Sequence, residues 1–209
     1  MRTQVLATVL AALAAVSTPR AQKIEGGPDP DRRASTLFLS TDSSEVLAGV
    51  SISYGAALWQ DSYDAMLTAL KGGNYTRLGK GWWTSLETCR AIEIGGTKIE
   101  AGSYYLGASV DEDGAFTLLI FDSGRAMKAG LLPGSTALYT GEAKAELGAP
   151  LTLAKEPPKE SVTRLEIEIS ADPKEPANGR LSLRWGKHEL FAPVKFLLPE
   201  ARKATPRKQ

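Results

Sequence analysis

The stretch AIEIGGTKIEAGSYYLGASVDEDGAFTLLIF, from Ala91 to Phe121, decides the fold class of this chain. Short runs rich in Ile, Tyr, Val and Phe alternate there with turn signals at Gly95-Gly96, Ala101-Gly102 and Asp111 to Gly114. A Gly-Gly pair between two such runs is typical of a two-residue β-hairpin. The stretch therefore predicts three or four short antiparallel strands. The last of them, Ala115 to Phe121, is apolar enough to be central.

Strand patterns continue on both sides of this stretch. Alternation of apolar with small or polar residues predicts half-buried strands at Ala48 to Tyr54, Val162 to Ile169 and Leu181 to Trp185. Glu189 to Phe196 is expected to pair back, with Pro193 indicating an edge strand or a bulge. About eight or nine strands with one or two short helices predict an all-β fold, an antiparallel β-sandwich.

One helix is indicated inside this β-rich body. Asp61 or Ser62 is a suitable N-cap, and Tyr63, Met66, Leu67 and Leu70 follow at helical spacing before Gly72-Gly73. Residues 74–81 are expected to be loop, and residues 126–131 predict one further helical turn.

The two ends of the chain indicate export of a single domain. Met1 to Gln4 carries one positive charge and precedes the apolar run Val5 to Val16, as in a secretory signal peptide. The run is short of the roughly 20 apolar residues that span a bilayer. We therefore expect a signal peptide over 1–21, a disordered segment over 22–34, one β-sandwich domain over 35–199 and a basic disordered tail over 200–209. The expected location is the periplasm or the cell exterior, with no stable membrane anchor after cleavage.

Composition excludes several classes of function. The formal net charge is +1 and the pI is about 7.8, which argues against nucleic acid as a partner. The single cysteine, Cys89, cannot form an internal disulfide, and its place beside a strand predicts a small, partly buried core residue.

The motif pattern resembles a bacterial family of exported proteins. GKGWW at Gly79 to Trp83, IGGTKIEAGSYYL at Ile94 to Leu106 and DGAFTLLIFD at Asp113 to Asp122 are similar to the domain of unknown function family twenty-nine-eleven. The resemblance covers roughly residues 35–198 and implies an exported β-sandwich with no established activity. The chain departs from the family where Trp83 stands in place of a common Arg.

No catalytic signature stands out in the sequence. The only histidine, His188, follows a turn, and no G-x-S-x-G motif accompanies it. The acidic turn Asp111 to Gly114 is too short for a calcium loop, and Gly79-Lys80-Gly81 lacks phosphate-loop spacing. The sequence therefore predicts no cofactor and no metal, and an enzyme is the less favoured interpretation.

The aromatic residues are the best candidates for a binding site. Adjacent residues of an extended segment face opposite sides, so one member of Trp82-Trp83 and one of Tyr104-Tyr105 is expected in the core and the other at the surface. Exposed aromatic faces stack on sugars or anchor partners. The candidate ligand-binding residues are Trp59, Trp82, Trp83, Tyr104 and Tyr105, while Trp185 is expected in the core.

Three functions stay open at this point. The first is a non-enzymatic binding or interaction module for an unknown small molecule, glycan or envelope protein. The second is a glycan hydrolase that uses two carboxylates among Asp61, Asp64, Glu87 and Asp111. The third is an envelope structural protein.

Overall fold

The computed structural model describes residues 27–64, 74–140, 142–156 and 158–199. These residues form twelve antiparallel strands and two short helices, so the predicted all-β class is confirmed. The strands are β1 Arg32–Ser40, β2 Val46–Gly55, β3 Asn74–Arg77, β4 Thr84–Thr88, β5 Ile92–Ile94, β6 Thr97–Ile99, β7 Gly102–Val110, β8 Phe116–Asp122, β9 Leu147–Leu153, β10 Val162–Ala171, β11 Asn178–Gly186 and β12 His188–Phe196. The helices are α2 Ser123–Lys128 and α3 Thr136–Tyr139.

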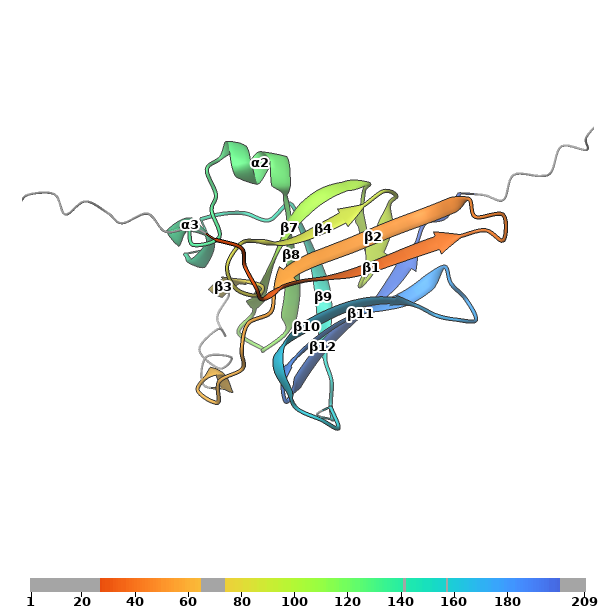
Figure 1. Cartoon of the computed structure of the whole chain (residues 1–209). Coiled ribbons are helices and arrows are strands. Elements are labelled where there is room, and N and C mark those ends of the chain that lie inside the picture. The colour runs from red at the N-terminus through yellow and green to blue at the C-terminus, as the bar shows by residue number, and fades with distance from the viewer. Residues whose placement is uncertain (1–26, 65–73, 141, 157, 200–209) are drawn as a thin grey trace, which may run out of the picture.

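The strands follow one hydrogen-bonded path rather than two separate sheets. The order is β1-β2-β4-β7-β8-β9-β12-β11-β10, with β3 added to β7 and the β5–β6 hairpin added to β12. The sheet folds over so that β1 and β2 lie across from β10 to β12 (Figure 1). At this closure the backbone N–H of Ile169 donates to Ser35 Oγ at 3.1 Å. A sandwich of two distinct sheets therefore stays a prediction.

The main core fills the space between the two halves of the folded sheet. In β2 and β10 about every second residue is buried, as expected for strands with one face against the core, whereas β7 and β8 are buried on both faces. This core is built from aliphatic side chains, among them Ile52, Leu86, Ile120, Ile167 and Val194. A second, smaller cluster lies on the outer face of β7 and β8, where α2 and α3 are placed.

The hairpins agree closely with the sequence prediction. Gly95 and Gly96 both have positive φ, 57° and 83°, which is the backbone of the two-residue turn that joins β5 to β6. The turn at Asp111 to Gly114 joins β7 to β8, and the Asp111 side chain accepts from the Ala115 N–H at 2.7 Å.

Four expectations need correction. About eight or nine strands were too few, because strands such as β1 form where no strand is expected. The expected loop over 74–81 begins with β3, which continues the edge of β7 beyond the end of β4. The expected helix after Asp61 is not among these four: Tyr63 and Asp64 are helical, and residues 65–73 lie outside the described residues.

The third correction concerns Pro193, which is expected in an edge strand or a bulge. It lies in β12, which is an interior strand of the sheet. Its carbonyl accepts from the Gly95 N–H at 2.9 Å, so its ring nitrogen faces the same side of β12. On that side β12 changes partner, from β9 at Phe191 to β5 at Val194. The missing N–H therefore falls in the gap between two partner strands.

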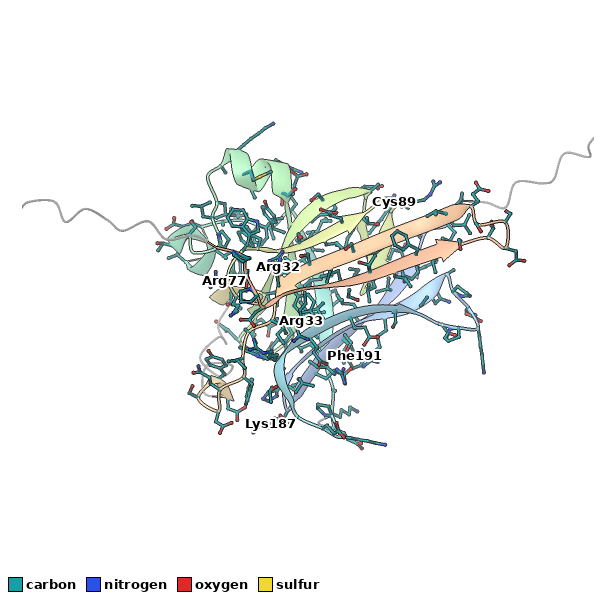
Figure 2. The ribbon with its side chains drawn as sticks, viewed as in Figure 1. Arg32, Arg33, Arg77, Cys89, Lys187 and Phe191 are labelled. Atoms are coloured by element: carbon teal, nitrogen blue, oxygen red, sulfur yellow. The ribbon has the colours of Figure 1, made fainter. Side chains whose placement is uncertain are left out.

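Cys89 is the fourth correction, because it is exposed and not part of the core. In β4 the side chains of Thr84, Leu86 and Thr88 point inward. The side chain of Cys89, the residue after Thr88, therefore points to the outer face (Figure 2). There its sulfur accepts from the Gly49 N–H at 3.0 Å.

Candidate functional site

A cavity of about 310 Å³ lies within the folded sheet, next to the β11–β12 turn and the start of β10. Its walls are mainly apolar, with a small number of polar groups. This volume and composition are typical of small-molecule sites. The lining residues are Ala57, Trp59, Tyr63, Thr76, Arg77, Leu78, Gly79, Lys80, Ala108, Val110, Phe116, Leu165, Leu183, Trp185, His188 and Leu190.

Three aromatic rings and an imidazole form one wall of the cavity. The Trp59 and Trp185 rings meet edge to face at 5.2 Å between centroids, and Tyr63 lies 5.9 Å from Trp59 and 4.9 Å from Trp185. The ring of His188 lies 5.4 Å from Trp59. Edge-to-face contacts of this kind favour a fixed ring arrangement. We refer to Trp59, Tyr63, Trp185 and His188 as the aromatic wall.

Backbone pairing brings the parts of the aromatic wall together. The segment after β2 bonds to the start of β10, with the Trp59 N–H donating to the Thr163 carbonyl at 2.8 Å. Trp185 and His188 are cross-strand partners at the β11–β12 turn. Trp185 Nε1–H donates to the Ala57 carbonyl at 2.9 Å, which ties that turn to the segment carrying Trp59.

A glycine makes room for the Trp59 ring. Gly186 has a φ of +60°, and a Cβ added there would lie 2.3 Å from the ring of Trp59. Only glycine combines this backbone conformation with so close an approach. The Trp59 ring therefore packs directly on the backbone of the β11–β12 turn.

An ion-paired carboxylate holds His188 in place. His188 Nε2 and Asp64 Oδ1 are 2.8 Å apart, and Lys187 Nζ lies 2.8 Å from Asp64 Oδ2. The hydrogen bond from Lys187, followed by that from His188, lowers the pKa of Asp64. The same bond raises the pKa of Lys187. The imidazole is thus anchored beside the cavity by a charged partner.

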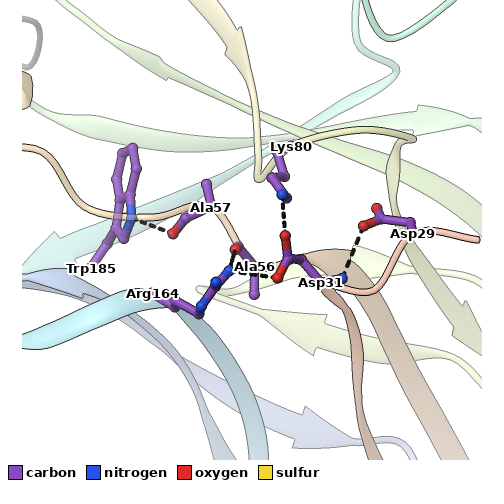
Figure 3. A network of polar contacts seen from close by, with 7 residues as sticks. All are labelled: Asp29, Asp31, Ala56, Ala57, Lys80, Arg164 and Trp185. Carbon is purple, nitrogen blue, oxygen red and sulfur yellow. Dashed lines mark hydrogen bonds and ion pairs between the residues drawn. The ribbon is translucent and has the colours of Figure 1, made fainter.

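A second polar network surrounds Lys80 on another side of the cavity (Figure 3). Asp31 pairs with both Lys80 and Arg164, and Arg164 Nη1 lies 2.7 Å from Asp31 Oδ1. The Lys80 hydrogen bond is the main reason why the pKa of Asp31 is lowered. Arg164 also donates to the Ala56 carbonyl at 3.2 Å, so the network joins the chain before β1 to β10.

Of the five predicted binding residues, only Trp59 lines this cavity. Trp83 is fully buried in the second cluster, where its ring stacks on Tyr105 at 5.1 Å, while the side chain of Trp82 is 54% exposed. Tyr104 is half-buried, its hydroxyl donates to the Glu100 carbonyl at 3.0 Å, and burial raises its pKa. Each adjacent pair is thus divided between opposite faces.

The carboxylates considered for a hydrolase lie outside the described cavity lining. Among the described residues, none of Asp61, Asp64, Glu87 and Asp111 lines the cavity. No serine or cysteine lines it either, so His188 has no nucleophile of those types in the described part of the site. The described ranges also contain no group of three His, Cys, Asp or Glu side chains placed to hold a metal ion.

Sequence reasoning missed most of the aromatic wall. Trp185, expected in the core, packs against it and also lines the cavity, and His188, which follows the turn, lines the cavity too. The spacing of Trp185 and His188 does indicate that these two residues are neighbours, because residues on either side of a two-residue turn are cross-strand partners. Nothing in the sequence indicates that Trp59 joins them.

Comparison with protein-family models, curated proteins and solved structures finds no match for this chain. The resemblance to family twenty-nine-eleven therefore stays a prediction. Within the described ranges, no helix is long and apolar enough to cross a membrane.

Proposed function

We propose that this protein is an exported, non-enzymatic binding module that takes a small ligand into the cavity beside the aromatic wall. The observation that carries the proposal is the cavity itself, about 310 Å³ in volume, with apolar walls and few polar groups. Burial of apolar ligand surface in such a space supplies most of the binding free energy, about 25 cal/mol per Å².

Two features support binding over hydrolysis. The lining residues Lys80 and His188 are engaged in contacts that hold the fold, Lys80 with Asp31 and His188 with Asp64. The rings of the aromatic wall are fixed by mutual contacts and by the Trp185 indole hydrogen bond. A site organised before the ligand arrives loses less conformational entropy on binding.

A thermal-shift screen with small apolar alcohols, carboxylates, glycans and peptides tests this proposal. A ligand at 100 times its dissociation constant stabilises the folded state by about 2.7 kcal/mol. We expect apolar compounds to raise the melting temperature.

Two matched variants locate the site. Ala108→Leu places added side-chain volume at the cavity wall, so the ligand-induced shift is lost. Trp82→Ala removes an exposed ring away from the cavity, so the shift is retained. A shift that survives Ala108→Leu but disappears in Trp82→Ala would place the site elsewhere and contradict the proposal.

A further inference from the structure

Two basic side chains of the cavity lining are each bonded to a carboxylate of the fold. Lys80 forms an ion pair with Asp31, and His188 Nε2 lies 2.8 Å from Asp64 Oδ1. Neither aspartate belongs to the lining, which contains no carboxylate among the described residues. Lys80 and His188 therefore have their acidic partners within the fold and need none from a ligand.

Arg77 borders the cavity, but its side chain belongs to the other face of the sheet. In the pairing of β3 with β7, Thr76 lies opposite Ala108, and both residues line the cavity. Adjacent side chains of a strand point to opposite faces, so Arg77 shares the outer face with Tyr75, which packs in the second cluster. Its Nη1 donates to the Gly81 carbonyl at 2.9 Å. The guanidinium therefore provides no charge inside the cavity.

The other polar side chains of the described lining are uncharged. They are the indoles and hydroxyls of Trp59, Trp185, Tyr63 and Thr76. The Trp185 indole N–H is used by the Ala57 carbonyl at 2.9 Å. Such groups can serve a neutral polar atom, but they cannot balance a charge. A charged group carried into this space would lose its hydration without gaining a counter-ion, which costs free energy.

We propose that the cavity takes an uncharged apolar ligand, because Asp31 and Asp64 already occupy the basic side chains of its lining. This inference rests on the proposed binding function and specifies its ligand class. Asp31 lies between Lys80 and Arg164, whose Nη1 is 2.7 Å from Asp31 Oδ1 (Figure 3). An anionic ligand that pairs with Lys80 would have to compete with a carboxylate that two cations hold in place.

Three compact compounds that share one apolar body test the ligand class. 1-Adamantanol, 1-adamantanecarboxylate and 1-adamantylamine are titrated into the protein by calorimetry at neutral pH, where the last two carry opposite charges. The polar group is attached directly to the rigid cage, so it enters the cavity with the apolar body. We expect 1-adamantanol to bind at least about tenfold more tightly than either charged compound.

Asp31→Asn tests the part played by the internal carboxylate. This variant leaves Lys80 as a lining cation without its acidic partner, so the affinity for 1-adamantanecarboxylate should rise about tenfold relative to that for 1-adamantanol. Adding Lys80→Met removes that cation, so the double variant should regain the wild-type preference. Asp113→Asn, on the exposed β7–β8 turn, is the matched control and should leave all three affinities unchanged.

The possible failures are distinguishable. If none of the three compounds binds, the proposed binding function itself is wrong. If either charged compound binds the wild type as tightly as 1-adamantanol, the cavity binds ligands but the uncharged ligand class is overturned. If Asp31→Asn leaves the ratio of affinities unchanged, the role given to Asp31 is overturned. The wild-type comparison needs no variant, so it decides the ligand class even if loss of the Asp31 ion pairs prevents folding.

Discussion

At the scale of single residues, Gly186 controls the position of the aromatic wall. An added Cβ would meet the Trp59 ring at 2.3 Å, in a backbone conformation that side chains rarely adopt. Trp59 in turn contacts Tyr63, Trp185 and His188. One methyl group at this glycine would therefore disturb every ring of the wall.

Gly186→Ala should destabilise the protein by about 1–3 kcal/mol and weaken ligand binding, since both the backbone and the Trp59 ring must move. Urea unfolding followed by ligand titration measures the two effects. Gly130→Ala is the matched control, because Gly130 has a similar φ of +67° with open space around it. Equal losses of ligand affinity in both variants would contradict the role given to the Trp59 contact.

Asp31 makes the fold sensitive to acid. Its pKa is lowered in the folded state, chiefly by the hydrogen bond from Lys80. A carboxyl group with a lowered folded-state pKa stabilises the protein above its unfolded pKa of about 3.9, and this contribution is lost as the pH falls through the folded value.

Asp31→Asn should lower the melting temperature at neutral pH and flatten its decline below about pH 4. Melting curves recorded across this range measure the difference. Asp113→Asn, on the exposed β7–β8 turn, should follow the wild-type curve. Parallel curves for Asp31→Asn and the wild type would show that the Asp31 ion pairs do not stabilise the folded state.

At the scale of elements, α2 packs on the outer face of β7 and β8 and α3 packs on β3, and together they cover a cluster centred on Trp83. The Trp83 side chain is fully buried, stacks on Tyr105 and donates from Nε1 to the Leu131 carbonyl at 3.4 Å. This cluster is separate from the cavity, so its role is to hold the helices on the sheet.

Trp83→Ala should cost about 3–5 kcal/mol of folding free energy, as expected for a large aromatic side chain removed from a packed core. Trp82→Ala should change stability by no more than about 0.5 kcal/mol, because its ring is mostly exposed. Denaturant unfolding of both variants provides the comparison. A larger loss for Trp82 than for Trp83 would contradict the assignment of these faces.

Strands and turns can be predicted from the sequence where interactions between residues close in the chain determine them. The Gly95-Gly96 turn, the Asp111 turn and the alternation in β2 and β10 follow from side-chain period and turn chemistry. Pro193 was misplaced because its tolerance depends on where β12 changes partner, which is a property of the assembled sheet. Cys89 was misplaced because the inward register of β4 was not known.

At the scale of the whole molecule, the cavity depends on contacts that no local pattern indicates. The Trp185 indole bonds to Ala57, 128 residues away in the sequence, and Arg164 bonds to Asp31 across 133 residues. These contacts form only when the sheet folds over on itself. Of the aromatic candidates only Trp59 therefore lines the cavity, and the lining residues Lys80 and His188 are not among the predicted site residues.

The proposed export has a direct test at this scale. The expected signal peptide, residues 1–21, ends before the described residues begin at position 27. The protein recovered from the periplasm or medium of its host should begin within a few residues of position 22, as read by N-terminal sequencing. Recovery of the full chain from the cytoplasm alone would contradict export.

The central claim is that a ligand occupies the cavity beside the aromatic wall, and a crystal structure of the protein soaked with 1-adamantanol tests it most directly. We predict ligand density in the cavity, against the Trp59 and Trp185 rings. An empty cavity at saturating 1-adamantanol, or ligand bound only on the outer surface, would contradict the central claim.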